Sequence, residues 1–284
     1  MIAEQLTWFI DGRYFYNNIT LDKIIHLASG HKNRLKIIIE ARIKSTERWY
    51  WQTIFADNSH ENDALALIHQ KKEKLLKVLQ MSAIKTEISI SQSADHIALL
   101  NTELSKSPNS LLILEDAPQN KRHPLFQTLT EIDSTILLLS NKAWKKPLNL
   151  LGAIDPLHEH DRPAKMDENI VKNVKLWSQS FTSKWGVAHC CYISSVLSKY
   201  KNKVLTIHKE ALHEFSEKWH IKEEQSILLE GKPEHALTTF IEKEHVDILF
   251  IGLVNRNIID RFWVGSTTSS FLVHPTCDLL LIKH

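Results

Sequence analysis

The sequence predicts an α/β fold made of two tandem units, each a five-stranded parallel sheet of strand order 3-2-1-4-5 flanked by helices. Short apolar runs alternate with longer amphipathic segments along both halves, which is typical of βα units around a parallel sheet. The two halves repeat the same succession of elements and differ most in the loop after the fourth strand, which is longer in the second half. Glycine is scarce, with 7 residues in 284, and this excludes collagen-like and flexible-linker chains.

In the first half, five apolar runs predict strands, and the segments between them predict helices. The expected strands are Leu6–Asp11, Leu35–Ala41, Thr86–Ser91, Leu111–Glu115 and Thr135–Leu139. The first helical segment carries its apolar residues at helical spacing. We expect Thr20 to cap the start of this helix, because its hydroxyl can accept a backbone N–H bond there.

The second half repeats this arrangement. The expected strands are Leu148–Asp155, Val187–Ile193, Gln225–Leu229, Asp247–Gly252 and Asp278–Ile282. Asp167 is the expected cap of a helix that ends before Gly186, and Trp177 falls on the apolar stripe of this helix. We therefore expect Trp177 to serve core or inter-domain packing rather than base stacking.

A polar, basic segment that ends in proline, Asn141–Pro147, indicates a linker between the two units. It divides the chain into a first domain of residues 1–141 and a second domain of residues 147–284. The lysines of such a segment more often belong to a solvated connector than to a binding patch.

Charge and cysteine content narrow the class of protein. Lys and Arg total 35 and Asp and Glu total 33, so the formal charge of +2 argues against coating of nucleic acid or of an anionic membrane. Three cysteines, Cys190, Cys191 and Cys277, are too few for a disulfide scaffold and favour a reducing compartment. No apolar run approaches the roughly 18 residues of a membrane span, and no secretory signal precedes the first strand. We expect a soluble, cytoplasmic protein.

The predicted ligand site lies at the carboxyl ends of the strands of the second half. In an open parallel sheet, ligands bind where the strand order reverses, here between the first and fourth strands. Asp155 ends the first of these strands, and Gly252 and Gly265 flank the loop after the fourth. Glycines allow backbone N–H groups to approach a phosphate, and a helix that starts near Ser266 and Thr267 would present the positive end of its dipole.

The motif Gly252-x2-Asn255-x9-Gly265-Ser266 resembles the nucleotide loop of universal stress proteins, which reads G-x2-G-x9-G-[S/T]. The segment that ends at Asp155 resembles the first strand of that family, and the two repeats resemble its tandem, E-type members. The resemblance implies that the second domain binds ATP, with Asp155 on the adenine–ribose side and the loop around the phosphates. It also implies that the two units pack through their fifth strands as an intrachain pseudo-dimer.

The chain departs from the family pattern at Asn255, where the family has glycine. Asparagine tolerates a left-handed backbone, and Arg256 can offset the negative charge that Asp260 adds to the loop. ATP binding is therefore a hypothesis for the second domain. The first domain has no glycine after its fourth strand and carries Glu115 and a second acid there, so we expect no ATP site in it.

Two other chemistries can be weighed against nucleotide binding. His158, His160 and Asp161 could hold a divalent metal, but no second ligand pair at a set spacing accompanies them, so a polar surface loop is favoured and no metal site is predicted. The same segment resembles a nucleotidyltransferase signature, with His160 and Asp161 where glycine and histidine belong. No nucleophile stands beside a base, so we expect no catalysis.

The sequence thus predicts a non-catalytic stress-response protein whose second domain binds ATP or another small ligand. The first domain would be structural or would bind a protein partner. An interaction scaffold with both pockets closed is the alternative. The sequence leaves open the identity of the ligand and whether the whole chain forms a homodimer.

Overall fold

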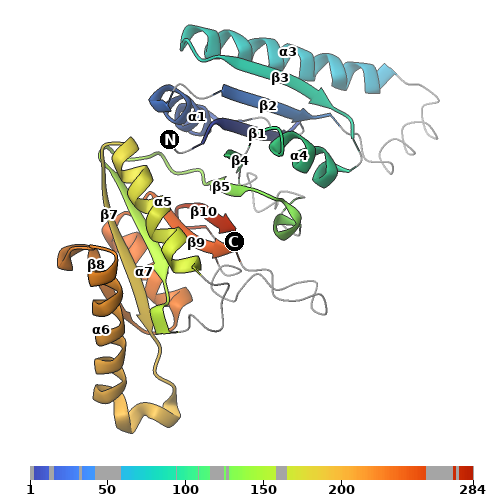
Figure 1. Cartoon of the computed structure of the whole chain (residues 1–284). Coiled ribbons are helices and arrows are strands. Elements are labelled where there is room, and N and C mark those ends of the chain that lie inside the picture. Colours follow the sequence, from blue (N-terminus) through green and yellow to red (C-terminus); the bar gives the residue numbers. More distant parts are fainter. Residues whose placement is uncertain are drawn as a thin grey trace.

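The computed structural model describes residues 3–12, 16–31, 34–41, 59–93, 95–107, 109–115, 125, 128–157, 165–253, 271–272 and 275–283. These residues form one ten-stranded sheet with helices on both faces (Figure 1). The strands of the first half are β1 (Gln5–Asp11), β2 (Arg34–Glu40), β3 (Thr86–Ser91), β4 (Ser110–Glu115) and β5 (Thr135–Leu139). Those of the second half are β6 (Leu148–Ile154), β7 (Ser183–Cys191), β8 (Ser226–Glu230), β9 (Ile248–Leu253) and β10 (Asp278–Lys283).

The helices lie mostly between successive strands, as expected for βα units. The α-helices are α1 (Asn18–His31), α3 (Ser59–Met81), α4 (His96–Leu104), α5 (Met166–Ser180), α6 (Lys201–Lys218) and α7 (Pro233–Glu244). Short 3-10 helices are η2 (Leu129–Glu131), η4 (Ser195–Tyr200) and η5 (Glu223–Gln225). Among the residues described, no helix combines the length and the apolar composition of a membrane span.

The sheet consists of two five-stranded blocks joined edge to edge. The strand order is β3-β2-β1-β4-β5-β10-β9-β6-β7-β8, so each block has the predicted order 3-2-1-4-5. Neighbouring strands are parallel within each block, and the two fifth strands pair antiparallel, with Leu280 opposite Leu137. This pairing removes two unpaired sheet edges. The predicted fold class is confirmed, and every predicted strand is present.

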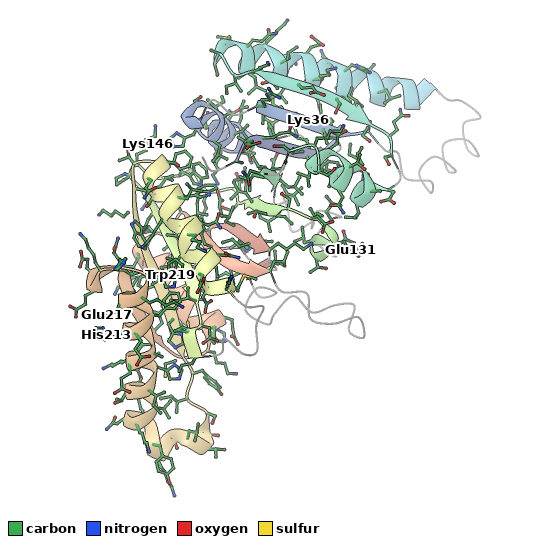
Figure 2. All side chains as sticks on the ribbon, in the orientation of Figure 1. Lys36, Glu131, Lys146, His213, Glu217 and Trp219 are labelled. Carbon is green, nitrogen blue, oxygen red and sulfur yellow. The ribbon has the colours of Figure 1, made fainter. Side chains whose placement is uncertain are left out.

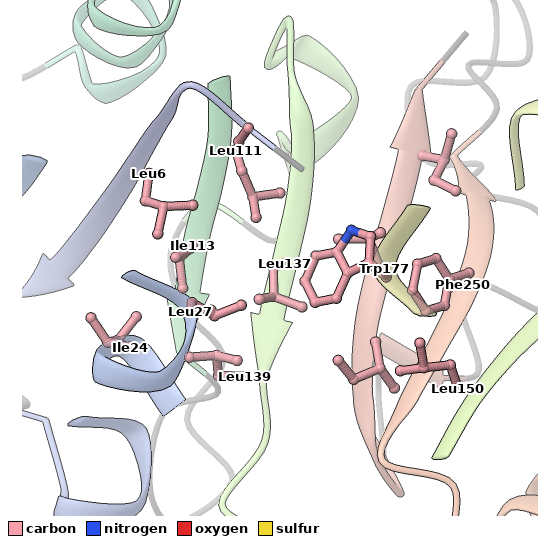
Figure 3. Close-up of a cluster of buried hydrophobic side chains, with 14 of the residues drawn as sticks. Leu6, Ile24, Leu27, Leu111, Ile113, Leu137, Leu139, Leu150, Trp177 and Phe250 are labelled. Carbon is pink, nitrogen blue, oxygen red and sulfur yellow. The ribbon is translucent and has the colours of Figure 1, made fainter. Parts of the chain in front are cut away.

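The strands are nearly continuous apolar runs because both faces of the sheet are covered. Each face carries one buried apolar cluster, and each cluster includes residues of both halves. On one face, Trp177 of α5 packs edge-on against Phe250 at a ring distance of 5.6 Å and points toward Leu137 of β5 (Figure 3). The prediction that Trp177 serves core packing is confirmed.

Three local predictions are wrong. The side chain of Asn17, rather than Thr20, accepts the backbone N–H of residue 20 at the start of α1. Asp167 lies inside the first turn of α5, and the preceding Lys165 occupies the N-cap position with a left-handed φ of 72°. Gly186 lies within β7 and does not end the helix, because β7 starts at Ser183.

A buried polar cluster joins the two halves beside the β5–β10 pair. The Lys23 ammonium on α1 contacts both carboxylate oxygens of Asp278 at 2.8 Å and the Ser140 carbonyl oxygen at 2.9 Å. Asp278, at the start of β10, also accepts bonds from the backbone N–H and hydroxyl of Ser140 and from the indole N–H of Trp144. Burial lowers the pKa of Lys23 and raises the pKa of Asp278, so each charge depends on the other.

The linker between the halves is attached at several points. The Lys142 ammonium donates to the Thr276 carbonyl, and the backbone N–H of Lys145 donates to the Asp247 carboxylate. The lysine side chains of the linker are exposed, as predicted for a connector, but these bonds and the partly buried Trp144 hold its path.

We expect single substitutions of the buried pair to be costly and strongly coupled. Asp278→Asn leaves the Lys23 charge buried without a counter-charge, so it should lower the free energy of unfolding by about 3–5 kcal/mol. Lys23→Met leaves the Asp278 carboxylate with only neutral donors and should cost a similar amount. Urea unfolding of both single variants and of the double variant measures the coupling.

The double variant should lose less stability than the sum of the two single losses, by at least about 1 kcal/mol. If the two losses in free energy of unfolding are additive, Lys23 and Asp278 do not interact. This result would contradict the conclusion that each charge depends on the other.

Candidate ligand site at the carboxyl edge of the second half

The carboxyl ends of β6 and β9 lie side by side at the point where the strand order of the second half reverses. The register places Gly152 of β6 opposite Phe250 of β9, so Asp155 emerges from the sheet next to the end of β9. The sequence prediction that the ends of the first and fourth strands meet at one edge is confirmed. This edge is where ligands of open parallel sheets bind.

The Asp155 side chain is held at this edge and remains partly exposed. Its carboxylate is 23% exposed, and its Oδ1 lies 3.7 Å from Nδ1 of His189 on β7. The backbone N–H of Asp155 donates to Oδ2 of Asp167 at 3.0 Å. A carboxylate that is positioned by its neighbours and open to solvent can accept bonds from the hydroxyl or amino groups of a ligand.

Asp167 fixes the start of this loop. It is 5% exposed and lies in the first turn of α5, where the helix dipole favours a negative charge. Its bond to the backbone of Asp155 joins α5 to the end of β6. Sequence analysis assigned Asp167 only a capping role, because nothing in the pattern shows that the two segments meet.

A histidine pair extends from the site toward α6. His189 is buried, and its Nε2 lies 2.7 Å from Nδ1 of His208. One of these nitrogens donates and the other accepts, so a proton on both facing atoms is disfavoured. The sequence pattern does not single out His208. A histidine within the apolar run of β7 was the signal that could have drawn attention to this pair.

Gly252 lies inside β9 and packs against α5. A Cβ atom at this position would lie 2.8 Å from both Cγ and Sδ of Met166, whose side chain is 2% exposed. β9 continues to Leu253, one residue past its predicted end, and the role of Gly252 in the ligand loop stays a prediction. A packing requirement accounts for this glycine, and the Met166 side chain occupies the adjacent space.

The remaining predicted site residues lie outside the described part of the chain. They are Asn255, Arg256, Gly265, Ser266 and Thr267, together with the metal alternative His158, His160 and Asp161. Within the described ranges, no group of three His, Cys, Asp or Glu side chains is arranged to hold a metal ion. The described part of the site thus consists of Asp155 and the neighbouring residues Asp167 and His189.

The thiols of Cys190 and Cys277 are unreactive. All three cysteines are free, and burial raises the pKa of Cys190 to about 12, with the Asp155 charge as a second cause. Burial likewise raises the pKa of Cys277 to about 12. Both thiols stay protonated at neutral pH, which makes them poor nucleophiles.

The corresponding edge of the first half carries a partly buried carboxyl group, that of Glu115. Glu115, at the end of β4, accepts the indole N–H of the fully buried Trp8 at 3.0 Å, and Tyr16 packs edge-on against that indole. Burial raises the pKa of Glu115 to about 7, against the opposing effects of bonds from Thr20 and Trp8 and of the Lys23 charge. Glu115 and its partners therefore face one another instead of a ligand.

The raised pKa of Glu115 predicts a pH dependence of stability. Between about pH 4.5 and pH 7 the folded protein holds this proton and the unfolded chain releases it, so stability falls as pH rises through this window. We expect chemical unfolding at several pH values to show that the free energy of unfolding of the wild type falls by a few kcal/mol across this window. The comparison is with Glu115→Gln, which cannot ionise. Parallel curves for the two proteins would contradict this assignment.

Comparison with known proteins identifies the second half. Residues 193–283 match the model of the universal stress protein family. The universal stress protein E homolog of Haemophilus influenzae is 18% identical over 286 residues, covering 93% of this chain and 92% of that protein. Universal stress protein E of Escherichia coli K12 is 29% identical over 86 residues, which cover 30% of this chain and 27% of that protein.

Solved structures share the architecture of the whole chain. A Pseudomonas aeruginosa PAO1 protein described as functionally unknown covers 99% of this chain and 92% of its own, with a TM-score of 0.71 and 15% identity. A universal stress protein from Archaeoglobus fulgidus covers 100% and 99%, with a TM-score of 0.65 and 13% identity. At such identities the likeness shows the fold alone. Residues 193–283 thus match the universal stress protein family, and the length of the chain fits the tandem-domain type of that family.

Proposed function

We propose that this protein is a non-catalytic stress-response protein whose second half binds ATP or another small ligand at the carboxyl edge of β6 and β9. The observation that carries the proposal is the partly exposed Asp155 carboxylate at the point where the strand order reverses. Asp167 fixes the backbone of Asp155, and the His189 ring lies 3.7 Å from the Asp155 carboxylate. A preorganised acceptor at this edge suits a ribose hydroxyl or an adenine amino group.

The sequence of the loop after β9 supports ATP as the first ligand to test. Gly265 and Ser266 keep the family spacing from Gly252, and Arg256 supplies a positive charge. Gly252 itself serves packing, so backbone approach to the phosphates would depend on Gly265.

The first half is proposed to be structural or to bind a protein partner. Its carboxyl edge holds Glu115 bonded to Trp8, and an ionised carboxylate there would repel a triphosphate. In the described residues, the two halves share a fold and differ in the carboxylates at their carboxyl edges.

A scaffold without a ligand is the second candidate. It is favoured by Met166, which packs directly against Gly252 and fills space beside the site. In this case both carboxyl edges would be closed by side chains of the chain itself, and the protein would act through its surface.

Calorimetric titration with Mg-ATP distinguishes the two candidates. Asp155→Asn replaces a charged acceptor with a neutral one of equal size and should weaken the Kd about tenfold. The matched variant Asp11→Asn changes the residue at the equivalent end of β1 and should leave the Kd unchanged.

Gly265→Val, in the loop, should abolish binding if backbone groups there hold the phosphates. Absence of heat with the wild type for ATP, ADP and AMP would favour the scaffold. Equal effects of the two Asn variants would contradict the placement of the site at Asp155.

A further inference from the structure

The η4–α6 segment carries a surface that the ligand site does not use. Figure 1 shows α6 and η4 at the end of the molecule farthest from α1, α3 and α4. Four apolar side chains of this segment are strongly exposed: Val196 (83%), Leu197 (44%), Tyr200 (61%) and Ile207 (45%). Exposed apolar side chains that gather in one segment mark an interaction surface.

The start of α6, residues 201–207, contributes no fully buried side chain to the fold. The helix spans 18 residues, yet its buried side chains are Leu212, Phe215 and Ser216, all in its second half. A helix gains most of its stability from packing of one face, and a short isolated segment is marginal in water. A partner against the exposed face would provide the missing contacts.

The charges along the exposed face of α6 are divided by sign. Lys199 and Lys203 precede Ile207, whereas Glu210, Glu214 and Glu217 follow it. Lys218 also follows on this side, but its ammonium pairs with Glu168 of α5 at 3.1 Å. Lys203, Ile207, Glu210 and Glu214 are spaced by three and four residues and share one side of the helix. In the described part of the chain, neither Lys199, Lys203, Glu210 nor Glu214 makes an ion pair. Figure 2 labels Glu217 and its neighbour His213 on α6.

We infer that this face binds a second copy of the chain, with the two α6 helices antiparallel and crossing at Ile207. A two-fold axis at Ile207 brings the basic start of each helix to the acidic end of the other. Lys203 then faces Glu210 and Glu214 of the second copy, and Lys199 lies beyond it toward Glu214 and Glu217. The exposed apolar residues gather at the centre and at the two ends of the contact.

The division of charge favours a second copy of the chain over an anionic membrane or an acidic protein as the partner. An anionic membrane or a uniformly acidic protein would attract Lys199 and Lys203, but it would be repelled by the three glutamates on the same face. A second copy in antiparallel orientation places opposite charges against both the basic and the acidic half of the helix. The interface is separate from the carboxyl edge proposed to bind a ligand, so either proposal can fail without the other.

Charge reversal on exposed side chains tests the inference. Sedimentation equilibrium of the full chain should show a dimer that weakens as salt concentration rises. Lys199→Glu with Lys203→Glu makes the face entirely acidic, and Glu210→Lys with Glu214→Lys makes its central part entirely basic. Each double variant should dimerise at least about tenfold more weakly than the wild type. An equimolar mixture of the two variants should recover a dimer, because their faces are then complementary.

The control reverses Lys74 and Lys77, two exposed lysines on α3, and should leave the dimer unchanged. A wild type that stays monomeric overturns the inference, as does a dimer that is insensitive to the α6 reversals. Cosedimentation of a monomeric wild type with phosphatidylglycerol vesicles, lost in Lys199→Glu with Lys203→Glu, would assign the face to an anionic surface and would also overturn it.

Discussion

The buried contact between Lys23 and Asp278 is the constraint on which the joined sheet depends. A lysine and an aspartate that are each about 2% exposed or less can remain charged only if they stay paired. Lys23 belongs to the first helix of the chain and Asp278 to its last strand, so this pair fixes the ends of the fold against each other. Ser140 and Trp144, which lead into the linker, complete the bonds of the carboxylate. The path of the linker and the antiparallel pairing of β5 with β10 follow from the same contact.

The two halves use one architecture for different purposes at their carboxyl edges. In the first half, Trp8 bonds Glu115 and fills the edge with groups that face one another. In the second half, Asp167 bonds the backbone of Asp155, and the Asp155 carboxylate lies beside His189 and stays partly open. The difference does not lie in the sheet, which has the same order in both blocks, but in the few side chains at the strand ends.

The fold can be predicted from the sequence because the two signals that indicate it, apolar runs and helical spacing, are local. Apolar runs and helical spacing are properties of neighbouring residues, and all ten strands follow from them within a few positions. Helix starts are less certain, since Asn17 and Thr20 can both accept a backbone N–H and only the folded chain selects one. The strand boundary at Gly252 fails for a similar reason: a glycine at the end of an apolar run indicates a turn, whereas contact with Met166 requires glycine within the strand.

The site was predictable only to the extent that topology determines it. The reversal of strand order places Asp155 beside the end of β9, and the sequence contains both strands. The supports of Asp155 come from α5 and β7, so Asp167 and His189 become visible only when those elements are folded together. The Lys23–Asp278 pair escaped prediction because its members are separated by most of the chain. Nothing in either local sequence distinguishes them from surface charges.

Hydrogen exchange of the full chain with and without Mg-ATP tests the central claim most directly, namely that only the second half offers a ligand edge. The account predicts that ATP slows exchange at the ends of β6 and β9 and in the loop that follows β9, and leaves the ends of β1 and β4 unchanged. Slower exchange at the ends of β1 and β4, or equal protection of both halves, would contradict it.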